Sequence, residues 1–263
     1  MDRTRRLNAW VLGGDGRYPW AVRALEKSGL PVKTWGVPDM TDDAPGLEAA
    51  LEGADLVLLP MAPFQGEQLK IGRDSVGAAL LPWLLEKHAL ILYGRMEPEM
   101  ETWLQNQGVR CVSYLELPPF QMTNAMITAE GAVGLAMAEL DRTLAGASVL
   151  VAGWGRIGKF LAEKLYALGA NVTVSARREA DWAEIEAMGL HAEETGVFHL
   201  GLEEYHLICN TVPARVFAER AGEIGTDCVC MELASEPGGF PPELGAFGLC
   251  MGKLPAVQGY NLS

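Results

Sequence analysis

Short apolar runs alternate with segments of helical periodicity along the first part of the chain. Five runs of strand length occur before residue 120, at residues 8–12, 31–35, 54–59, 89–93 and 109–113. Helical patterns separate them, around Ala21 to Leu25, around Leu80 to Leu85 and from residue 97 to residue 107. Strands that alternate with helices are typical of a parallel sheet with helices on both faces. The pattern therefore predicts an α/β domain over residues 1–120.

The alternation is interrupted at Leu117-Pro-Pro-Phe120 and then returns. Residues 124–140 form a helical segment that is apolar on most faces, and a helix of that kind is normally buried. We interpret it as a crossing helix between two domains. Strand-like runs follow at residues 149–151, 171–175, 205–209, 227–231 and 247–251. The expected architecture is two Rossmann-like, doubly wound parallel-sheet domains, residues 1–120 and 121–263, joined by the crossing helix.

A glycine-rich turn follows the first strand of the second domain. The sequence Gly153-Trp-Gly155-Arg156-Ile157-Gly158 lies between that strand and a helical segment that extends to Leu168. In a dinucleotide-binding turn, the first glycine permits the reversal, the second lets a pyrophosphate approach, and the third allows close helix packing. The phosphates lie on the free N–H groups of the helix N-terminus. A purely structural turn is the alternative, but the flanking strands and helix favour a cofactor site.

The residues that end the next strand indicate which cofactor is bound. Enzymes that use NAD usually carry an acidic residue there, which binds the ribose 2′-hydroxyl. This chain has Ser175-Ala176-Arg177-Arg178 instead. A hydroxyl and two guanidinium groups can bind a 2′-phosphate through charge-assisted hydrogen bonds. The prediction is therefore NADP, against the alternative that both arginines are solvated loop charges.

Further cofactor contacts are expected at the ends of later strands, because ligands of parallel sheets bind beyond the carboxyl ends of the strands. Thr211-Val212-Pro213 follows the run at residues 205–209, and Ser235 follows the run at residues 227–231. Neither Thr211 nor Ser235 has an adjacent base, so contact with the nicotinamide ribose or amide fits them better than nucleophilic catalysis.

The composition argues against several classes of function. The net charge is −13, and no basic stripe of the kind that binds nucleic acid occurs. The five cysteines include no CxxC pair, which favours a reducing compartment and no metal site. No apolar run approaches the length of a membrane span, and the N-terminus lacks the apolar core of a signal peptide. We therefore expect a cytoplasmic protein that binds neither nucleic acid nor a membrane.

Taken together, these motifs resemble the family of dipicolinate synthase A subunits. The matching elements span nearly the whole chain: Gly13-Gly14-Asp15-x-Arg17, Leu59-Pro60, Asn124, Thr128-x-Glu130-Gly131, Gly153-x-Gly155-Arg156-x-Gly158, Ala176-Arg177, Asn210-Thr211-x-Pro213, Leu233-Ala234-Ser235-x-Pro237-Gly238-Gly239 and Leu254-Pro255. The resemblance implies a fold similar to that of the D-2-hydroxyacid dehydrogenases. It also implies NADP-linked oxidation of a dihydrodipicolinate to pyridine-2,6-dicarboxylate during sporulation. A flavoprotein-like B subunit is the implied partner, and self-association stays open.

This chemistry requires a group that binds carboxylates and a group that accepts a proton. Arg17 is the candidate carboxylate clamp, because it follows a glycine-rich strand end and a guanidinium matches a carboxylate in bidentate geometry. Glu130 is the candidate general base, because it is a carboxylate within an otherwise apolar helix. A surface arginine and a carboxylate that braces the domain contact are the respective alternatives. We expect both to face one cleft between the domains, opposite Thr211 and Ser235.

Two other functions stay open at this point. Residues 256–263 depart from the sequence that follows Leu254-Pro255 in the family, so the chain could be a catalytically silent, NADP-binding regulatory or partner subunit. The second alternative is an NADP-dependent reductase of another carbonyl or imine acid.

Overall fold

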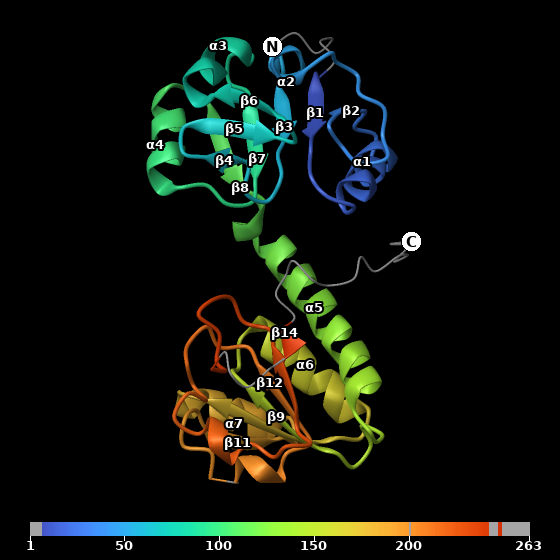
Figure 1. Ribbon diagram of the computed structural model, residues 1–263, viewed down its shortest axis with the longest axis vertical. Coiled ribbons are helices and arrows are strands. Elements are labelled where there is room, and N and C mark those ends of the chain that lie inside the picture. The colour runs from blue at the N-terminus through green and yellow to red at the C-terminus, as the bar shows by residue number, and fades with distance from the viewer. Residues whose placement is uncertain (1–6, 200, 242–246, 249–263) are drawn as a thin grey trace. The chain divides into compact units, whose positions relative to one another are not determined.

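The computed structural model describes residues 7–199, 201–241 and 247–248 (Figure 1). The chain divides into two compact units, residues 1–120 and 121–263. Each unit has its own parallel sheet and its own apolar core.

The first unit is built on a five-stranded parallel sheet with the order β2-β1-β3-β7-β8. Its strands are β1 (Ala9–Leu12), β2 (Lys33–Trp35), β3 (Leu56–Leu58), β7 (Leu90–Tyr93) and β8 (Arg110–Ser113). Its helices are α1 (Tyr18–Lys27), α2 (Leu47–Leu51), α3 (Leu81–Leu84) and α4 (Pro98–Asn106), with 3₁₀ turns η1 (Ala78–Leu80) and η2 (Tyr114–Glu116). Helix α1 packs on one face of the sheet, and α2, α3 and α4 pack on the other. The predicted doubly wound α/β domain is confirmed.

A small antiparallel sheet in the first unit was not predicted from the sequence. It consists of β4 (Phe64–Gln65), β5 (Gln68–Ile71) and β6 (Asp74–Gly77) in sequential order. Alternate residues on these strands, Leu69, Ile71 and Val76, are buried in the same core as the parallel sheet. The strands have only two to four residues, so the apolar alternation is too short to stand out in the sequence.

The loops that follow β3 and β7 meet at close range. The backbone N–H of Arg95 donates to the carbonyl oxygen of Met61 at 2.5 Å. A Cβ atom at the neighbouring Gly94 would lie 2.5 Å from that same oxygen. The contact therefore requires glycine at position 94, and it fixes the carboxyl ends of two adjacent strands against each other.

Helix α5 (Pro118–Glu139) corrects two expectations from the sequence. It begins before Asn124, because Pro118 and Pro119 occupy the first helical turn. A backbone N–H group has no partner within the helix there, so the missing N–H of proline costs nothing. The prolines therefore start the helix and do not form a separate linker. The helix is also not buried on all sides: its small residues, such as Ala129 and Ala132, are buried, whereas Met137 is 61% exposed.

The second unit has a six-stranded parallel sheet with the order β11-β10-β9-β12-β13-β14. Its strands are β9 (Ser148–Ala152), β10 (Asn171–Ala176), β11 (His191–Glu194), β12 (Leu207–Asn210), β13 (Val229–Glu232) and β14 (Phe247–Gly248). Helices α6 (Arg156–Ala167) and α7 (Glu179–Ala187) follow β9 and β10, and 3₁₀ turns η3 (Leu202–Glu204) and η4 (Ala221–Glu223) follow β11 and β12. Of the predicted strand at residues 247–251, residues 249–251 lie outside the described residues.

The two faces of this second sheet are covered differently. Helices α5, α6 and α7 pack on one face through residues such as Ala132, Leu161 and Ile185. The other face is covered by connecting segments that carry three stacked aromatic rings, with centroids 5.0 Å apart for Phe198–Phe217 and 4.7 Å apart for Phe217–Phe240. Among the helices that the structure describes, none has the length and apolar character needed to cross a membrane.

Replacement of Gly94 by alanine tests the contact between the two loops of the first unit. The added methyl group would overlap the backbone at Met61, so we expect the variant to lose about 1–3 kcal/mol of stability. Gly16→Ala is the matched control, because a Cβ atom there meets no other atom within 4 Å. Urea-induced unfolding of both variants measures the difference, and equal stabilities would contradict the prediction.

Candidate functional site

The glycine turn after β9 has no room for side chains at its first and last glycines. Gly153 has a backbone φ of +105°, and a Cβ atom there would lie 2.5 Å from Oγ1 of Thr211. A Cβ atom at Gly158 would overlap the carbonyl oxygen of Gly153. The contact of the turn with the loop after β12 accounts for Gly153, and the packing of helix α6 against the turn accounts for Gly158, in both cases without any ligand.

Gly155 is different, because protein packing does not require it. A Cβ atom at this position would meet no other atom within 4 Å, and the residue is exposed. Gly155 is also the N-cap of α6, and because glycine has no side chain, no side-chain acceptor caps the first helical turn. The first N–H groups of a helix have no partner within the helix and point toward anions. The backbone from Gly155 to Gly158 therefore fits a bound pyrophosphate.

Trp154 and Lys159 brace this turn against helix α7. The indole Nε1 of Trp154 donates to Oε2 of Glu184 at 3.0 Å, and the ammonium group of Lys159 donates to Oε1 of Glu184 at 2.6 Å. The Lys159 hydrogen bond is the main reason that the pKa of Glu184 lies below its usual value. These contacts hold the beginning of α6 in place. Of the other residues predicted to contact the cofactor here, Arg156 is exposed and Ile157 is half-buried.

Two of the residues that end β10 do not reach the surface. Ser175 is fully buried, and its Oγ accepts a hydrogen bond of 3.3 Å from Oγ1 of Thr195. Ala176 is buried as well, and its carbonyl oxygen accepts a hydrogen bond of 2.9 Å from Nε1 of Trp182. The expectation that the Ser175 hydroxyl meets a 2′-phosphate is therefore corrected, because a side chain in the strand interior points into the core.

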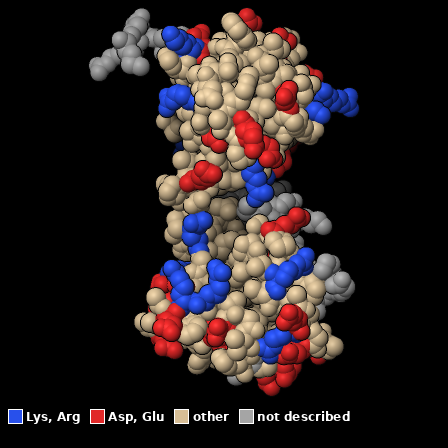
Figure 2. Space-filling view, turned by 90° about the vertical axis from the view of Figure 1, so that its left-hand side faces the viewer, with Lys and Arg blue, Asp and Glu red and all other residues tan. Residues whose placement is uncertain are grey.

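The two arginines after β10 are both exposed but differ in their partners. Arg178 donates from Nε and Nη2 to the carboxylate of Asp181 at 2.8 and 2.5 Å. The hydrogen bonds with Arg178 are the main reason that the pKa of Asp181 is lowered. Arg177 makes no ion pair with any other residue that the structure describes. Basic side chains gather on one face of this unit (Figure 2), and Arg177 is the member of the predicted pair that is open to an anion.

The predicted residues after β12 and β13 lie at the same sheet edge as the glycine turn, because β9, β12 and β13 are adjacent parallel strands. Thr211 donates from Oγ1 to the carbonyl oxygen of Ala152 at 2.8 Å. Val212 is half-buried, whereas Pro213 and Ser235 are exposed. The parallel register therefore brings these residues next to the end of β9.

Arg17 is paired with an acidic residue of its own loop. It donates from Nε to Oδ1 of Asp15 at 2.9 Å and from Nη2 to Oδ2 at 2.6 Å. The hydrogen bond with Arg17 is the largest cause of a lowered pKa at Asp15. Both side chains are 54% exposed, so the pair lies at the surface. Among the described residues, no hydrogen bond uses Nη1 of Arg17, and that edge of the guanidinium can still receive a carboxylate.

Two tyrosines beside Arg17 were missed by the sequence analysis. The hydroxyl groups of Tyr18 and Tyr114 lie 3.0 Å apart, and the Tyr18 hydroxyl also donates to the carbonyl oxygen of Leu59 at 3.3 Å. Burial raises the pKa of both tyrosines. They come from positions 18 and 114, which only the folded sheet brings together, so no local sequence signal could have paired them. A cavity of about 270 Å³ beside Tyr18 is also lined by Asp15 and Lys70.

Glu130 lies in the middle of helix α5 and is half-buried. Two residues earlier, the Thr128 hydroxyl donates to the carbonyl oxygen of Asn124 at 2.7 Å. Arg17 belongs to the first unit and Glu130 to the second. The expectation that they share a cleft therefore stays a prediction.

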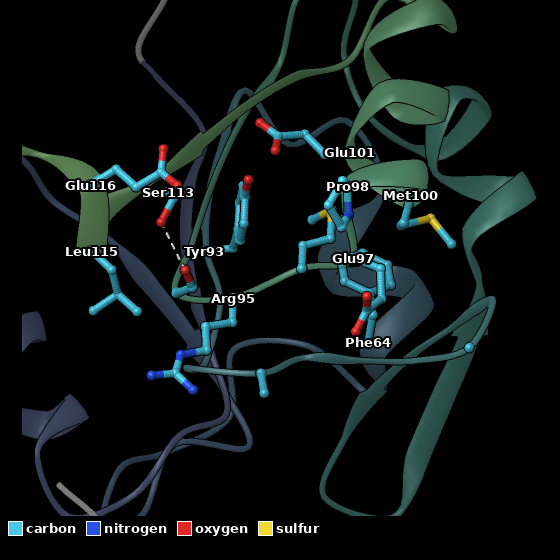
Figure 3. A pocket seen from close by; sticks show the side chains of 14 residues that line it. Phe64, Tyr93, Arg95, Glu97, Pro98, Met100, Glu101, Ser113, Leu115 and Glu116 are labelled. Carbon is cyan, nitrogen blue, oxygen red and sulfur yellow. Dashed lines mark hydrogen bonds between the residues drawn. The ribbon is translucent and has the colours of Figure 1, made fainter. Parts of the chain in front are cut away.

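A larger cavity of about 700 Å³ lies at the carboxyl ends of β7 and β8 in the first unit (Figure 3). The hydroxyl of Tyr93 points toward the carboxylate of Glu101, while Arg95 extends into another part of the cavity. Burial, together with the nearby Glu101, raises the pKa of Tyr93. The Ser113 hydroxyl donates to the carbonyl oxygen of Gly94 at 2.8 Å and so ties the two strand ends together. The cavity combines one cation with several carboxylates, and it shares only Ala62 with the lining of the smaller cavity.

The cysteines that the structure describes are all unpaired thiols, namely Cys111, Cys209, Cys228 and Cys230. Three of them are buried, and burial raises the pKa of Cys111 to about 12. Cys250 lies outside the described residues. Within the described part of the chain, no three His, Cys, Asp or Glu side chains gather in a way that could hold a metal ion.

Comparison with known proteins points to one family. Residues 8–115 match the model of the N-terminal domain of the dipicolinate synthase A subunit. The dipicolinate synthase A subunit of Bacillus subtilis (strain 168) is 26% identical over 250 residues, which cover 89% of this chain and 82% of the relative.

Solved structures give the same result. The crystal structure of the dipicolinate synthase A subunit from Bacillus halodurans has a TM-score of 0.75 at 25% identity and covers 90% of this chain and 85% of its own. The transhydrogenase of Sinorhizobium meliloti shares the fold with a TM-score of 0.61 at 16% identity, covering 89% of this chain and 81% of its own. The resemblance to the A subunits of dipicolinate synthase is therefore confirmed, over residues 8–115 by the model of their N-terminal domain and over most of the chain by the relative and the solved structure.

Proposed function

We propose that this chain is an NADP-dependent oxidoreductase that oxidises a dihydrodipicolinate to dipicolinate, the reaction that its resemblance to the A subunits of dipicolinate synthase implies. The observation that carries the cofactor part is the open space at Gly155, at the N-terminus of α6, in a turn whose other glycines are explained by packing. A phosphate of the cofactor explains why position 155 also lacks a side chain.

Each end of the cofactor has its own group of residues in this proposal. The backbone of residues 153–158 receives the pyrophosphate, and Arg177 receives the 2′-phosphate. Thr211, Val212, Pro213 and Ser235 surround the nicotinamide end, because parallel-sheet ligands lie beyond the carboxyl ends of the strands. When bound, NADP supplies the acceptor for a hydride from the substrate.

Arg17 binds a substrate carboxylate in this proposal. Asp15 holds Nε and Nη2 of the guanidinium, which orients the Arg17 side chain and leaves Nη1 for the substrate. The Tyr18 hydroxyl donates to the carbonyl oxygen of Leu59, so the Tyr114 hydroxyl donates its only proton to Tyr18 and has none to offer the substrate. The guanidinium therefore both orients and neutralises the substrate carboxylate without help from these tyrosines.

Glu130 accepts the proton that the dihydropyridine ring loses as it becomes aromatic. The reaction forms no covalent bond to the protein, so it needs a general base and no nucleophile. A carboxylate can serve as that base. The half-buried position of Glu130 limits its contact with water.

The Bacillus subtilis relative is one of at least two kinds of subunit by its name, which supports an assembly with a second kind of chain. We extend this to a partner of the flavoprotein-like B type and to action in the cytoplasm of a sporulating cell.

The cofactor preference tests the role of Arg177. We expect Arg177→Ala to weaken NADPH binding by about tenfold or more, as the loss of a charge-assisted hydrogen bond predicts, and to leave NADH binding nearly unchanged. Arg178→Ala is the matched control, because Asp181 already holds that guanidinium, and we expect a smaller effect. Calorimetric titration of both cofactors measures the affinities. Equal affinity of the unmodified protein for NADPH and NADH would refute the assignment.

The glycine turn is tested by Gly155→Val. A Cβ atom at this position meets no other protein atom within 4 Å, so we expect circular dichroism to show an intact fold. The added side chain would occupy the place of the pyrophosphate, so we expect cofactor binding to be lost. Undiminished binding of NADPH in a titration would remove this turn from the site.

Substrate kinetics separate the roles of Arg17 and Glu130. We expect Arg17→Ala mainly to raise KM, and Glu130→Gln to lower kcat by about 100-fold or more at unchanged shape. Glu139→Gln, on the exposed end of the same helix, is the matched control and should leave kcat unchanged. Turnover of freshly generated dihydrodipicolinate, with and without a B-type partner, provides the measurement. Normal kcat in Glu130→Gln would exclude this residue as the base.

A further inference from the structure

The carboxylate of Glu232, at the end of β13, accepts hydrogen bonds on both of its oxygens. Oε1 receives Nδ2 of Asn210 at 2.6 Å and the backbone N–H of Ala234 at 3.1 Å. Oε2 receives the backbone N–H groups of Gly239 at 2.7 Å and Phe240 at 3.3 Å. All four neighbours are donors, so both oxygens of the Glu232 carboxyl group must be acceptors.

Asn210, at the end of the adjacent strand β12, is fully buried and extends this network to the next loop. Its Nδ2 donates to the carbonyl oxygen of Val212 at 2.8 Å, and its Oδ1 accepts from the backbone N–H of Val212 at 3.1 Å. One side chain thus holds both backbone groups of Val212 and, through Glu232, the segment from Ala234 to Phe240. The side chains of Asn210 and Glu232 thus tie the two loops to each other.

Glycines allow the second loop to come this close. A Cβ atom at Gly239 would lie 2.5 Å from Cγ and Nδ2 of Asn210. A Cβ atom at Gly238, where φ is +71°, would lie 2.9 Å from Oε2 of Glu232. The Gly238-Gly239 pair is therefore explained by close packing within the protein, as Gly153 and Gly158 are.

We infer that Asn210 and Glu232 are positioning residues, which fix the loops bearing Val212 and Ser235 in the geometry that orients the nicotinamide ring. The inference rests on the proposed function, because it assumes that these loops receive the nicotinamide end of NADP. Neither side chain reaches the ligand itself: Asn210 is fully buried, and both oxygens of Glu232 are occupied by donors of the protein. They fix the orientation of the nicotinamide ring. The phosphates of NADP are bound by other residues, namely 153–158 and Arg177.

Glu232→Gln tests this role. An amide keeps the size of the side chain but turns one acceptor into a donor, which then faces N–H groups of the loop or of Asn210. We expect the fluorescence enhancement of bound NADPH, which reports an ordered nicotinamide ring, to be largely lost and NADPH affinity to fall by about tenfold. Affinity for 2′-phospho-ADP-ribose, which lacks the nicotinamide ring, should change by less than about twofold.

Glu163→Gln is the matched control, because this exposed glutamate of α6 makes the same charge change within the same unit. It should leave both ligands unaffected. If Glu232→Gln does not fold, Gly239→Ala provides a second route, since its methyl group displaces the Asn210 amide and leaves the Glu232 side chain unchanged. The same loss of fluorescence with retained fragment binding is then expected.

The outcomes separate this inference from the proposal on which it rests. An unmodified protein that binds neither NADPH nor the fragment contradicts the proposed function and removes the basis of the inference. An unmodified protein that binds both, with NADPH fluorescence unchanged in the folded variants, overturns the positioning role alone. A parallel loss of NADPH and fragment affinity also overturns it, because the network would then support the whole site and not the nicotinamide end.

Discussion

The close approach of the turn after β9 to the loop after β12 is the constraint on which the rest of the second unit depends. Gly153 and Gly158 lie where any side chain would overlap Thr211 or the turn itself. This contact places the N-terminus of α6 directly at the end of the central strand pair. Once it is set, the free N–H groups of the helix and the loops after β12 and β13 must share one edge of the sheet.

Loops that border such an edge must be held without the regular hydrogen bonds of a strand. Buried backbone groups that lack a partner cost free energy, so each loop needs its own acceptors and donors. In the second unit, Asn210 and Glu232 supply them to the loops after β12 and β13. In the first unit, the Ser113 hydroxyl and the carbonyl oxygen of Met61 do the same for the loops after β3 and β7. Different residues in the two units thus supply the hydrogen bonds that hold the loops at the strand ends.

Local signals in the sequence predicted the parallel strands, the helices after them and the glycine turn, but not the contacts between distant residues. The strands β4 to β6 were missed because two to four residues carry too little pattern. The start of α5 was misplaced because proline, usually a helix breaker, is favourable in the first turn. Side-chain alternation directs Ser175 into the core, where Thr195 meets it. The pairing of Tyr18 with Tyr114 requires the register of the whole sheet.

The ion-pair partner of an arginine determines which of its N–H groups can bind a ligand. Asp181 and Asp15 show why a charge at the right position is not yet a binding group. Each carboxylate takes two N–H groups of a nearby guanidinium, and each must share that guanidinium with any incoming anion. For Arg178 the partner lies one helical turn away on α7, so the guanidinium is held along the helix. For Arg17 the partner lies two residues away in the same loop, and one edge of the guanidinium stays open. Nη1 of Arg178 takes part in no hydrogen bond of the described residues either, so both ion pairs fix the guanidinium through Nε and Nη2 and leave the same edge open. The backbone around each arginine, and not the ion pair, therefore decides which ligand that open edge can meet.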